Sequence, residues 1–325
     1  MDRRRAALIA VTLLGTGLAV YGLQAAIDPG ALGAAFAAVR WEWIVLSAVA
    51  YAVSQTTAGL VWRVGLSAGG LGAVGRGHAI GTHWMARGAG ELLPAQLGEG
   101  VRVATVRRHP ATSDGGCARI AGSLGAYKLI DGIGNFAVVG LLTLVIPLPG
   151  PVANLRWIVL GVLAGALTFG LIVNRVGLER ATAHLPRRVS HAVENVVNGA
   201  ALLGDGRRVA GAFALHGLSA TARIVSLGAL LLAFGLPFQA ALLVFAVLVM
   251  ASLIPISPGG VGVREAALVP ALVAAYGLSA DSVLAFSLSI QATVLAVSLL
   301  GGLIALAHHH TGLRRVRALP GPAAV

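Results

Sequence analysis

The chain has 325 residues, of which 57% are hydrophobic and 11% are charged, and its formal net charge is +12. Soluble domains carry about a quarter charged residues, so this composition excludes a soluble globular protein and predicts an all-α integral membrane protein. The arginines cluster between apolar runs, which argues against nucleic-acid binding, and a single cysteine, Cys117, excludes an internal disulfide bond and a thiolate metal site.

Apolar runs close to the length that crosses a bilayer recur along the chain. They predict about eight transmembrane helices in one polytopic membrane domain that comprises residues 1–325. The first run could instead be a signal peptide cleaved near residues 25–26, but its length favours a retained span. The first expected span ends at residue 26. The other seven cover about 41–62, 119–146, 155–174, 209–234, 238–256, 263–277 and 281–307.

The distribution of arginines predicts the orientation of the chain. Sixteen lie in segments that would be cytoplasmic, and two, Arg40 and Arg156, lie in segments that would be external. Because basic residues are retained on the cytoplasmic side, both termini are expected inside the cytoplasmic (inner) membrane, with an even number of crossings. Residues 178–205 carry an apolar stripe beneath a basic face, which suits either a helix lying on the inner leaflet or a solvated cytoplasmic helix.

Residues 78–109 are too polar for a span that faces lipid and too apolar for a simple loop. Both ends of this segment must be cytoplasmic if the arginine distribution is to hold, so we expect a re-entrant helical hairpin. His83, Arg87 and Glu91 follow one another at intervals of four and share one helical face. That face could line a cavity or lie at the membrane interface.

Residues 254–268 interrupt the apolar pattern a second time, with prolines and glycines followed by Arg264 and Glu265. Irregular backbone inside a membrane survives only when it is buried in protein or lines a wet cavity, and charged side chains at that depth usually mark a substrate path. We therefore expect a broken helix at a translocation site. The residues of the break that we assign to this site are Ser257, Pro258, Gly259, Gly260 and Gly262.

The two interrupted segments share the spacing Pro-x-x-x-Gly, at Pro94 and Gly98 and again at Pro258 and Gly262. Broken helices in corresponding halves of a transporter point to a binding site between repeats, so an inverted repeat is a possible origin of the chain.

Arginine presents a planar fork of donors to phosphate, so Arg102 and Arg264 are candidate phosphate clamps. Free backbone amides at Gly259, Gly260 and Gly262 could add an anion-binding helix end. Acidic partners for these arginines could be Glu99, Glu265 and Asp131, and purely structural ion pairs are the alternative interpretation. Replacing Arg264 or Glu265 by alanine is expected to abolish transport without unfolding the chain.

Two further features add candidate residues. Lys128 is the only lysine, and Lys128 and Asp131 are spaced to pair on one helix face, with a structural and a functional role equally open. Arg223 lies within an expected span and could also face a cavity.

The strings LLPAQLGEGVR and IPISPGGVGVREAAL, together with the Lys-x-x-Asp pair at Lys128 and Asp131, resemble the lysylphosphatidylglycerol synthase transmembrane-region family. The resemblance covers nearly the whole chain and implies a flippase-like membrane domain. In two-part members of this family, the membrane domain flips an aminoacylated phospholipid that a cytoplasmic synthase domain makes. The chain ends at Val325, so a stand-alone member without the synthase domain is expected, and Gln96 replaces an expected arginine.

These features favour a lipid translocase that moves an anionic phospholipid, glycolipid or polyprenyl-phosphate-linked lipid through a polar intramembrane cavity. The alternatives are a membrane-embedded transferase and a non-transporting subunit in envelope lipid or glycan biosynthesis. The expected partners are membrane lipids, with a separate lipid-modifying or glycosyl transferase and a homo-oligomer left open. We expect no metal and no cofactor. We also expect no enzymatic activity, since no loop is long enough for a nucleotide-sugar domain and the chain has no phosphate-binding loop for ATP hydrolysis.

Overall fold

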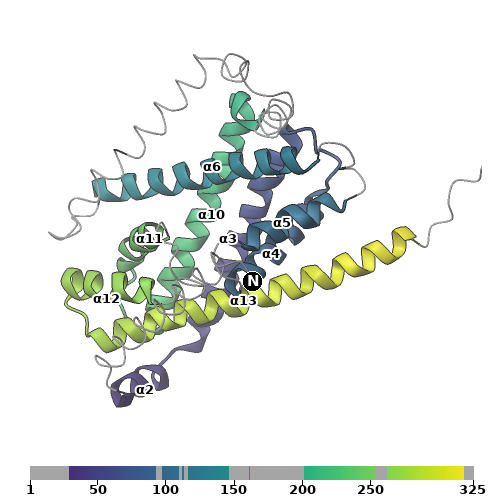
Figure 1. Cartoon of the computed structure of the whole chain (residues 1–325). Coiled ribbons are helices and arrows are strands. Elements are labelled where there is room, and N and C mark those ends of the chain that lie inside the picture. Colours follow the sequence, from purple (N-terminus) through teal and green to yellow (C-terminus); the bar gives the residue numbers. More distant parts are fainter. Residues whose placement is uncertain are drawn as a thin grey trace, which may run out of the picture.

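The computed structural model describes residues 29–92, 97–109, 112, 116–145, 161, 201–252 and 262–317. Within these residues every regular element is a helix and no strand occurs (Figure 1). Among these described residues, three helices are long and apolar enough to cross a membrane: α3 (Trp41–Ala68), α10 (Gly206–Ala233) and the part of α13 (Ala280–Arg317) that runs to His308. The expectation of an all-α membrane protein is therefore confirmed.

The other described helices complete the bundle. They are α2 (Pro29–Ala37), α4 (Arg76–Leu92), α5 (Leu97–Arg107), α6 (Gly116–Val145), the 3-10 helix η3 (Ala201–Gly204), α11 (Ala240–Ala251) and α12 (Val263–Tyr276). Each expected span that the structure describes coincides with one helix. The first expected span, the span at 155–174 and the amphipathic segment at 178–205 lie outside the described residues, so the total of eight crossings stays a prediction.

Helices α3 and α10 pack side by side through the centre of the molecule (Figure 1). Ser47 lies 3.0 Å from Ser226 and Ser54 lies 3.1 Å from Ser219, measured between hydroxyl oxygens. The residue numbers rise along one helix while they fall along the other, so the two helices are antiparallel. Seven residues separate the two serines on each helix, which places them on one face two turns apart. Small residues let the backbones approach closely, and their hydroxyls pair across the interface.

Helices α4 and α5 form a hairpin that packs against α3 and α13. A Cβ atom added to Gly98 would lie 2.5 Å from the carbonyl oxygen of Ala86, and one added to Gly88 would lie 2.9 Å from that of Ser298. These two glycines are therefore required by the close approach of neighbouring backbones. The helical hairpin expected at 78–109 is present, and its entry into the membrane from the inner side stays a prediction.

Helices α11, α12 and α13 share an apolar core with α10, in which Phe245, Leu268, Leu272 and Phe286 are fully buried. The chain leaves α11 at Ala251 and begins α12 at Val263, so the second interruption falls where the sequence predicts it. Gly262 precedes α12 with a φ angle of +85°, a conformation that glycine adopts without a steric penalty. The helix break thus has a specific backbone requirement at its C-terminal end.

Candidate functional site

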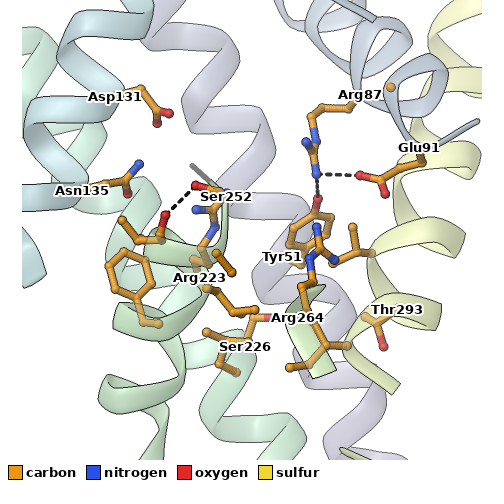
Figure 2. Close-up of a pocket in the computed structure, with 18 of the residues that line it drawn as sticks. Tyr51, Arg87, Glu91, Asp131, Asn135, Arg223, Ser226, Ser252, Arg264 and Thr293 are labelled. Atoms are coloured by element: carbon orange, nitrogen blue, oxygen red, sulfur yellow. Dashed lines mark hydrogen bonds and ion pairs between the residues drawn. The ribbon is translucent and has the colours of Figure 1, made fainter. Parts of the chain in front are cut away.

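A cavity of about 410 Å³ lies inside the helical bundle. Its wall includes Glu91 and Gly98 from the two sides of the first interruption, and Ser252 and Arg264 from the two sides of the second. The two interruptions, far apart in the chain, therefore border one space. Figure 2 shows side chains from both sides of the bundle converging on this cavity.

The described wall of the cavity carries five basic and three acidic side chains. Each basic side chain comes from a different helix, so no single amphipathic helix produces the cluster. The formal excess is two positive charges, which favours an anionic guest. The basic residues are Arg87 on α4, Arg102 on α5, Lys128 on α6, Arg223 on α10 and Arg264 on α12, and the acidic residues are Glu91, Glu99 and Asp131.

Arg102 is the most enclosed of the five cations, with 2% of its surface exposed. Its guanidinium carbon lies 5.0 Å from the centres of both the Trp62 and the Tyr127 rings, in position for cation–π interactions. It also forms an ion pair of 3.2 Å with Glu99 and a hydrogen bond of 3.1 Å with Nδ1 of His83. Arg102 is thus held from several sides, which fits a fixed charge in the wall.

Lys128 and Asp131 do not pair with each other as their spacing on one helix suggests. Lys128 reaches across to α5 and binds Glu99 at 2.5 Å, while Asp131 lies 3.5 Å from Nδ1 of His216 on α10. The physical reason is that opposite charges on neighbouring helices are within reach and gain contact across the cavity wall. Both residues consequently tie α6 to other helices.

The face of α4 that carries His83, Arg87 and Glu91 points inward. Arg87 forms an ion pair of 2.8 Å with Glu91 and donates a hydrogen bond of 2.8 Å to the hydroxyl of Tyr51 (Figure 2). His83 lies deeper, 3.2 Å from the amide oxygen of Gln55. Of the two alternatives for this face, the structure therefore places Arg87 and Glu91 on the wall of the larger cavity and His83 on that of a smaller one.

Arg264 and Glu265 are neighbours in the sequence but do not bind each other. Arg264 faces the cavity and donates a 2.5 Å hydrogen bond to the side-chain oxygen of Gln291. Glu265, with 1% of its surface exposed, accepts a hydrogen bond of 2.6 Å from the backbone N–H of Gly262 and one of 3.2 Å from Ser287. Successive residues in a helix point about 100° apart, so only one of the two can face the cavity.

This position changes the expectation for Glu265. Its carboxylate satisfies a backbone donor at the start of α12, which is the task of a capping residue. Replacement by alanine should therefore destabilise the helix start, whereas the sequence led us to expect an effect on transport alone. Gly262 likewise shapes the break and does not line the cavity.

Arg223 is half-buried and lines the cavity beside Asn135 and Ser226 (Figure 2). Within the described part of the chain, its guanidinium has no hydrogen-bond or ion-pair partner. A cation in this position is free to bind an incoming anion without first losing a protein contact. Arg223 and Arg264 are therefore the two cations best suited to contact a substrate.

A second, smaller cavity of about 90 Å³ adjoins the first. The two share seven wall residues, so the same side chains border both cavities. The shared residues are Arg87, Glu99, Arg102, Lys128, Asp131, Asn135 and Arg223, and the smaller cavity adds His83, His216, Gln55, Tyr127 and Ser219 among others.

Most of the residues singled out in the sequence converge on this place. Pro94, Ser257, Pro258, Gly259 and Gly260 lie outside the described residues. The structure adds Tyr51, Asn135, His216 and Gln291, which sequence reasoning missed. Their common signal is a polar side chain inside an apolar helix, which is a weak signal without knowledge of the neighbouring helix. Among the described residues, no group of three or more His, Cys, Asp and Glu side chains is placed to hold a metal.

A sequence model of the lysylphosphatidylglycerol synthase transmembrane region matches residues 7–302 of the chain. The chain therefore belongs to this family, and it is a membrane protein of lipid and envelope biosynthesis. A search of curated proteins found no match.

Proposed function

We propose that this member of the lysylphosphatidylglycerol synthase transmembrane-region family moves an anionic lipid across the membrane, with the headgroup carried through the larger cavity. One observation carries the proposal: five basic side chains from five helices surround a single space within the bundle. Placing so many charges inside a membrane protein is costly and usually serves a substrate. The function is transport, and no catalytic group is assigned.

The physical problem of lipid translocation is the charge on the headgroup. A phosphate must cross about 30 Å of hydrocarbon, and moving a bare charge there costs from about 2.5 kcal/mol on insertion scales to more than 10 kcal/mol in simulations. A cavity with excess positive charge replaces part of the lost hydration. Arginine is well suited to this task because its fork of donors matches two phosphate oxygens.

Arg223 and Arg264 would make the direct contacts with phosphate. Gln291 binds Arg264 through a neutral amide, so a phosphate can displace it and gain a charge-assisted hydrogen bond. Arg102 and Lys128 are already paired with Glu99, and Arg87 is paired with Glu91. These three cations would instead supply a fixed positive field around the guest.

Apolar side chains form part of the cavity wall. Leu227, Leu230, Phe245, Leu248, Ile290 and Val294 line the same cavity from α10, α11 and α13. A lipid has a polar headgroup joined to apolar chains, so a cavity with both charged and apolar lining matches its two parts. This arrangement supports a lipid over a free phosphate as the guest.

The test is headgroup movement by the purified full-length chain in vesicles. The probes are phosphatidylglycerol and a polyprenyl phosphate, each with a fluorescent label that a membrane-impermeant reductant bleaches only in the outer leaflet. We expect the chain to bring inner-leaflet label to the outside faster than protein-free vesicles do. Arg223→Gln and Arg264→Gln should each slow this movement by about 10- to 100-fold, the loss expected for one charge-assisted hydrogen bond.

Arg207→Gln is the matched control, because Arg207 lies on the same helix as Arg223 but is exposed and does not line the cavity. This variant should move lipid at the wild-type rate. The proposal fails if the wild-type chain moves neither probe, or if the cavity variants move lipid as fast as the control. Mass spectrometry of the recovered lipid separates the alternatives. A chemically changed headgroup supports a transferase. A lipid that is neither moved nor chemically changed supports a non-transporting subunit.

A further inference from the structure

Asp131 on α6 and His216 on α10 form a contact that the anion site does not use, and this contact becomes an ion pair when His216 is protonated. The carboxylate oxygen Oδ1 of Asp131 lies 3.5 Å from Nδ1 of His216. His216 is 5% exposed, whereas Asp131 is partly open to the cavity. Ionisable pairs of this kind inside a membrane protein are typical of proton pathways.

The helix that carries Asp131 is built to receive the His216 ring. Gly134 follows Asp131 by three residues and so lies on the same face of α6. The imidazole fills the place where a side chain at position 134 would begin, because a Cβ atom there would lie 2.5 Å from Nε2 and closer still to Cδ2 of His216. Glycine at position 134 is therefore required for this contact.

The protonation chemistry follows from the two ring nitrogens. The Asp131 carboxylate favours the tautomer that carries its proton on Nδ1, which leaves the lone pair of Nε2 able to accept a proton. Nε2 is buried and has no hydrogen-bond partner among the described residues. Transfer of a proton from water to Nε2 would break an O–H bond of the water, form the Nε2–H bond and release hydroxide to the solution. The product is an imidazolium, whose charge the Asp131 carboxylate would offset.

Several charged groups share the wall of the smaller cavity with His216. Arg223 is the cation on the same helix, and seven residues, or about 10 Å along the axis, separate it from His216. Its positive charge opposes a second positive charge on His216, while the Asp131 carboxylate favours one. The other titratable or charged groups on this wall are His83 and Arg87 from α4, Glu99 and Arg102 from α5, and Tyr127 and Lys128 from α6.

We propose that the Asp131–His216 pair is a proton-binding site coupled to the lipid phosphate, so that the anion and a proton are bound together. The inference rests on the proposed function of the cavity, because it takes Arg223 to contact the phosphate. A bound anion offsets the charge of Arg223 and so removes part of the repulsion that opposes the imidazolium. Because such linkage is reciprocal, protonation of His216 strengthens anion binding to the same extent.

The first test measures the affinity of the purified full-length chain in detergent for dihexanoyl phosphatidylglycerol between about pH 5.5 and pH 8. This probe keeps one negative charge throughout the range. Protonation adds a positive charge near the anion, so binding should tighten as the pH falls, by at most about tenfold per pH unit for one linked proton. Binding that does not change with pH, or no binding, would overturn the inference.

Substitutions at His216 and Asp131 test whether the linked proton is bound by this pair. His216→Gln should bind the probe with an affinity that is independent of pH. Asp131→Asn should move the transition to lower pH, because the carboxylate that stabilises the imidazolium is gone. His308→Gln is the matched control, since His308 is exposed on α13 and lines neither cavity, and it should keep the wild-type pH dependence. If the His216→Gln variant still binds the probe in a pH-dependent way, the linked proton is bound by another residue and the assignment is wrong.

The second test needs no variant. Adding the same probe to the wild-type chain in weakly buffered solution near neutral pH should make the solution more alkaline, as the protein takes up protons. An indicator dye reports this change, and no uptake despite binding contradicts the proposal. These tests need no lipid movement, so proton-linked binding without transport leaves this inference standing while the transport proposal falls. Lipid transport combined with pH-independent binding would support the transport proposal and overturn the proton-binding inference.

Discussion

The α4–α5 hairpin and the start of α12 each place an arginine close to a glutamate beside a helix interruption, but they use the two residues in opposite ways. In the hairpin, Arg102 is buried between two aromatic rings, while Glu99 lines the cavity and bridges Arg102 and Lys128. At the start of α12, Glu265 is buried and caps the helix, while Arg264 lines the cavity and binds the neutral amide of Gln291.

The difference shows that residue type at an interruption does not fix its role. An arginine that is buried against aromatic rings and paired with a carboxylate is held in place, so it contributes a constant charge. An arginine held by a neutral amide forms a stronger hydrogen bond when an anion replaces that amide, so anion binding is favourable there. The free energy of unfolding should therefore separate the two regions, and three substitutions test this, in order of decreasing loss of stability.

The largest loss is expected for Arg102→Gln. Glutamine removes the ion pair with Glu99 and the interactions with the Trp62 and Tyr127 rings, and it leaves space between the rings. We expect the free energy of unfolding to fall by about 3 kcal/mol, measured by denaturant titration in micelles. Arg102→Lys keeps the charge but not the planar group, so it should recover only part of the loss. A fully stable Arg102→Gln variant would contradict the structural role of this arginine.

A smaller loss is expected for Glu265→Ala. The substitution leaves the buried N–H of Gly262 and the Ser287 hydroxyl without their acceptor, at a cost of about 2 kcal/mol. Glu265→Gln keeps one oxygen acceptor and should lose less. The same titration, combined with the vesicle assay on the folded fraction, separates stability from transport. If Glu265→Ala unfolds like the wild type but moves no lipid, the carboxylate acts on the substrate and the capping role is wrong.

The smallest loss of stability is expected for Arg264→Gln. This partly exposed side chain gives up one hydrogen bond to Gln291, so the free energy of unfolding should change by less than about 1 kcal/mol. The headgroup movement should nevertheless fall as described above. A loss of stability as large as that of Arg102→Gln would remove the distinction between the two regions.

Much of the fold could be predicted from the sequence because hydrophobic length is a local property. The apolar runs near 41–62, 209–234 and 281–307 are helices in the structure, and the polar breaks near residues 94 and 258 separate helices where expected. Charged residues from both breaks also border one cavity, namely Glu99 and Arg102 at the first and Arg264 at the second. The burial of a charge in a membrane requires a partner or a guest, and this rule is strong enough to mark candidate residues without a structure.

The pairing of those charges could be predicted only in part, since Glu99 does pair with Arg102, as one of the partners that the sequence suggests. The spacing of Lys128 and Asp131 suggests a pair on one helix, but each binds a different neighbouring helix. The adjacency of Arg264 and Glu265 gives no indication of which one faces inward. His216 carries only the weak signal of a polar side chain inside an apolar helix, and its partner lies 85 positions away in the sequence.

The sequence by itself determined that this is a helical membrane protein with two interrupted, charged segments, because hydrophobicity, helix length and the cost of intramembrane charge depend on neighbouring residues along the chain. Only the tertiary structure decided which arginine is enclosed, which one faces the cavity, and which histidine meets Asp131. Those outcomes depend on the rotation of each helix about its axis and on the side chain that an adjacent helix presents a few ångströms away.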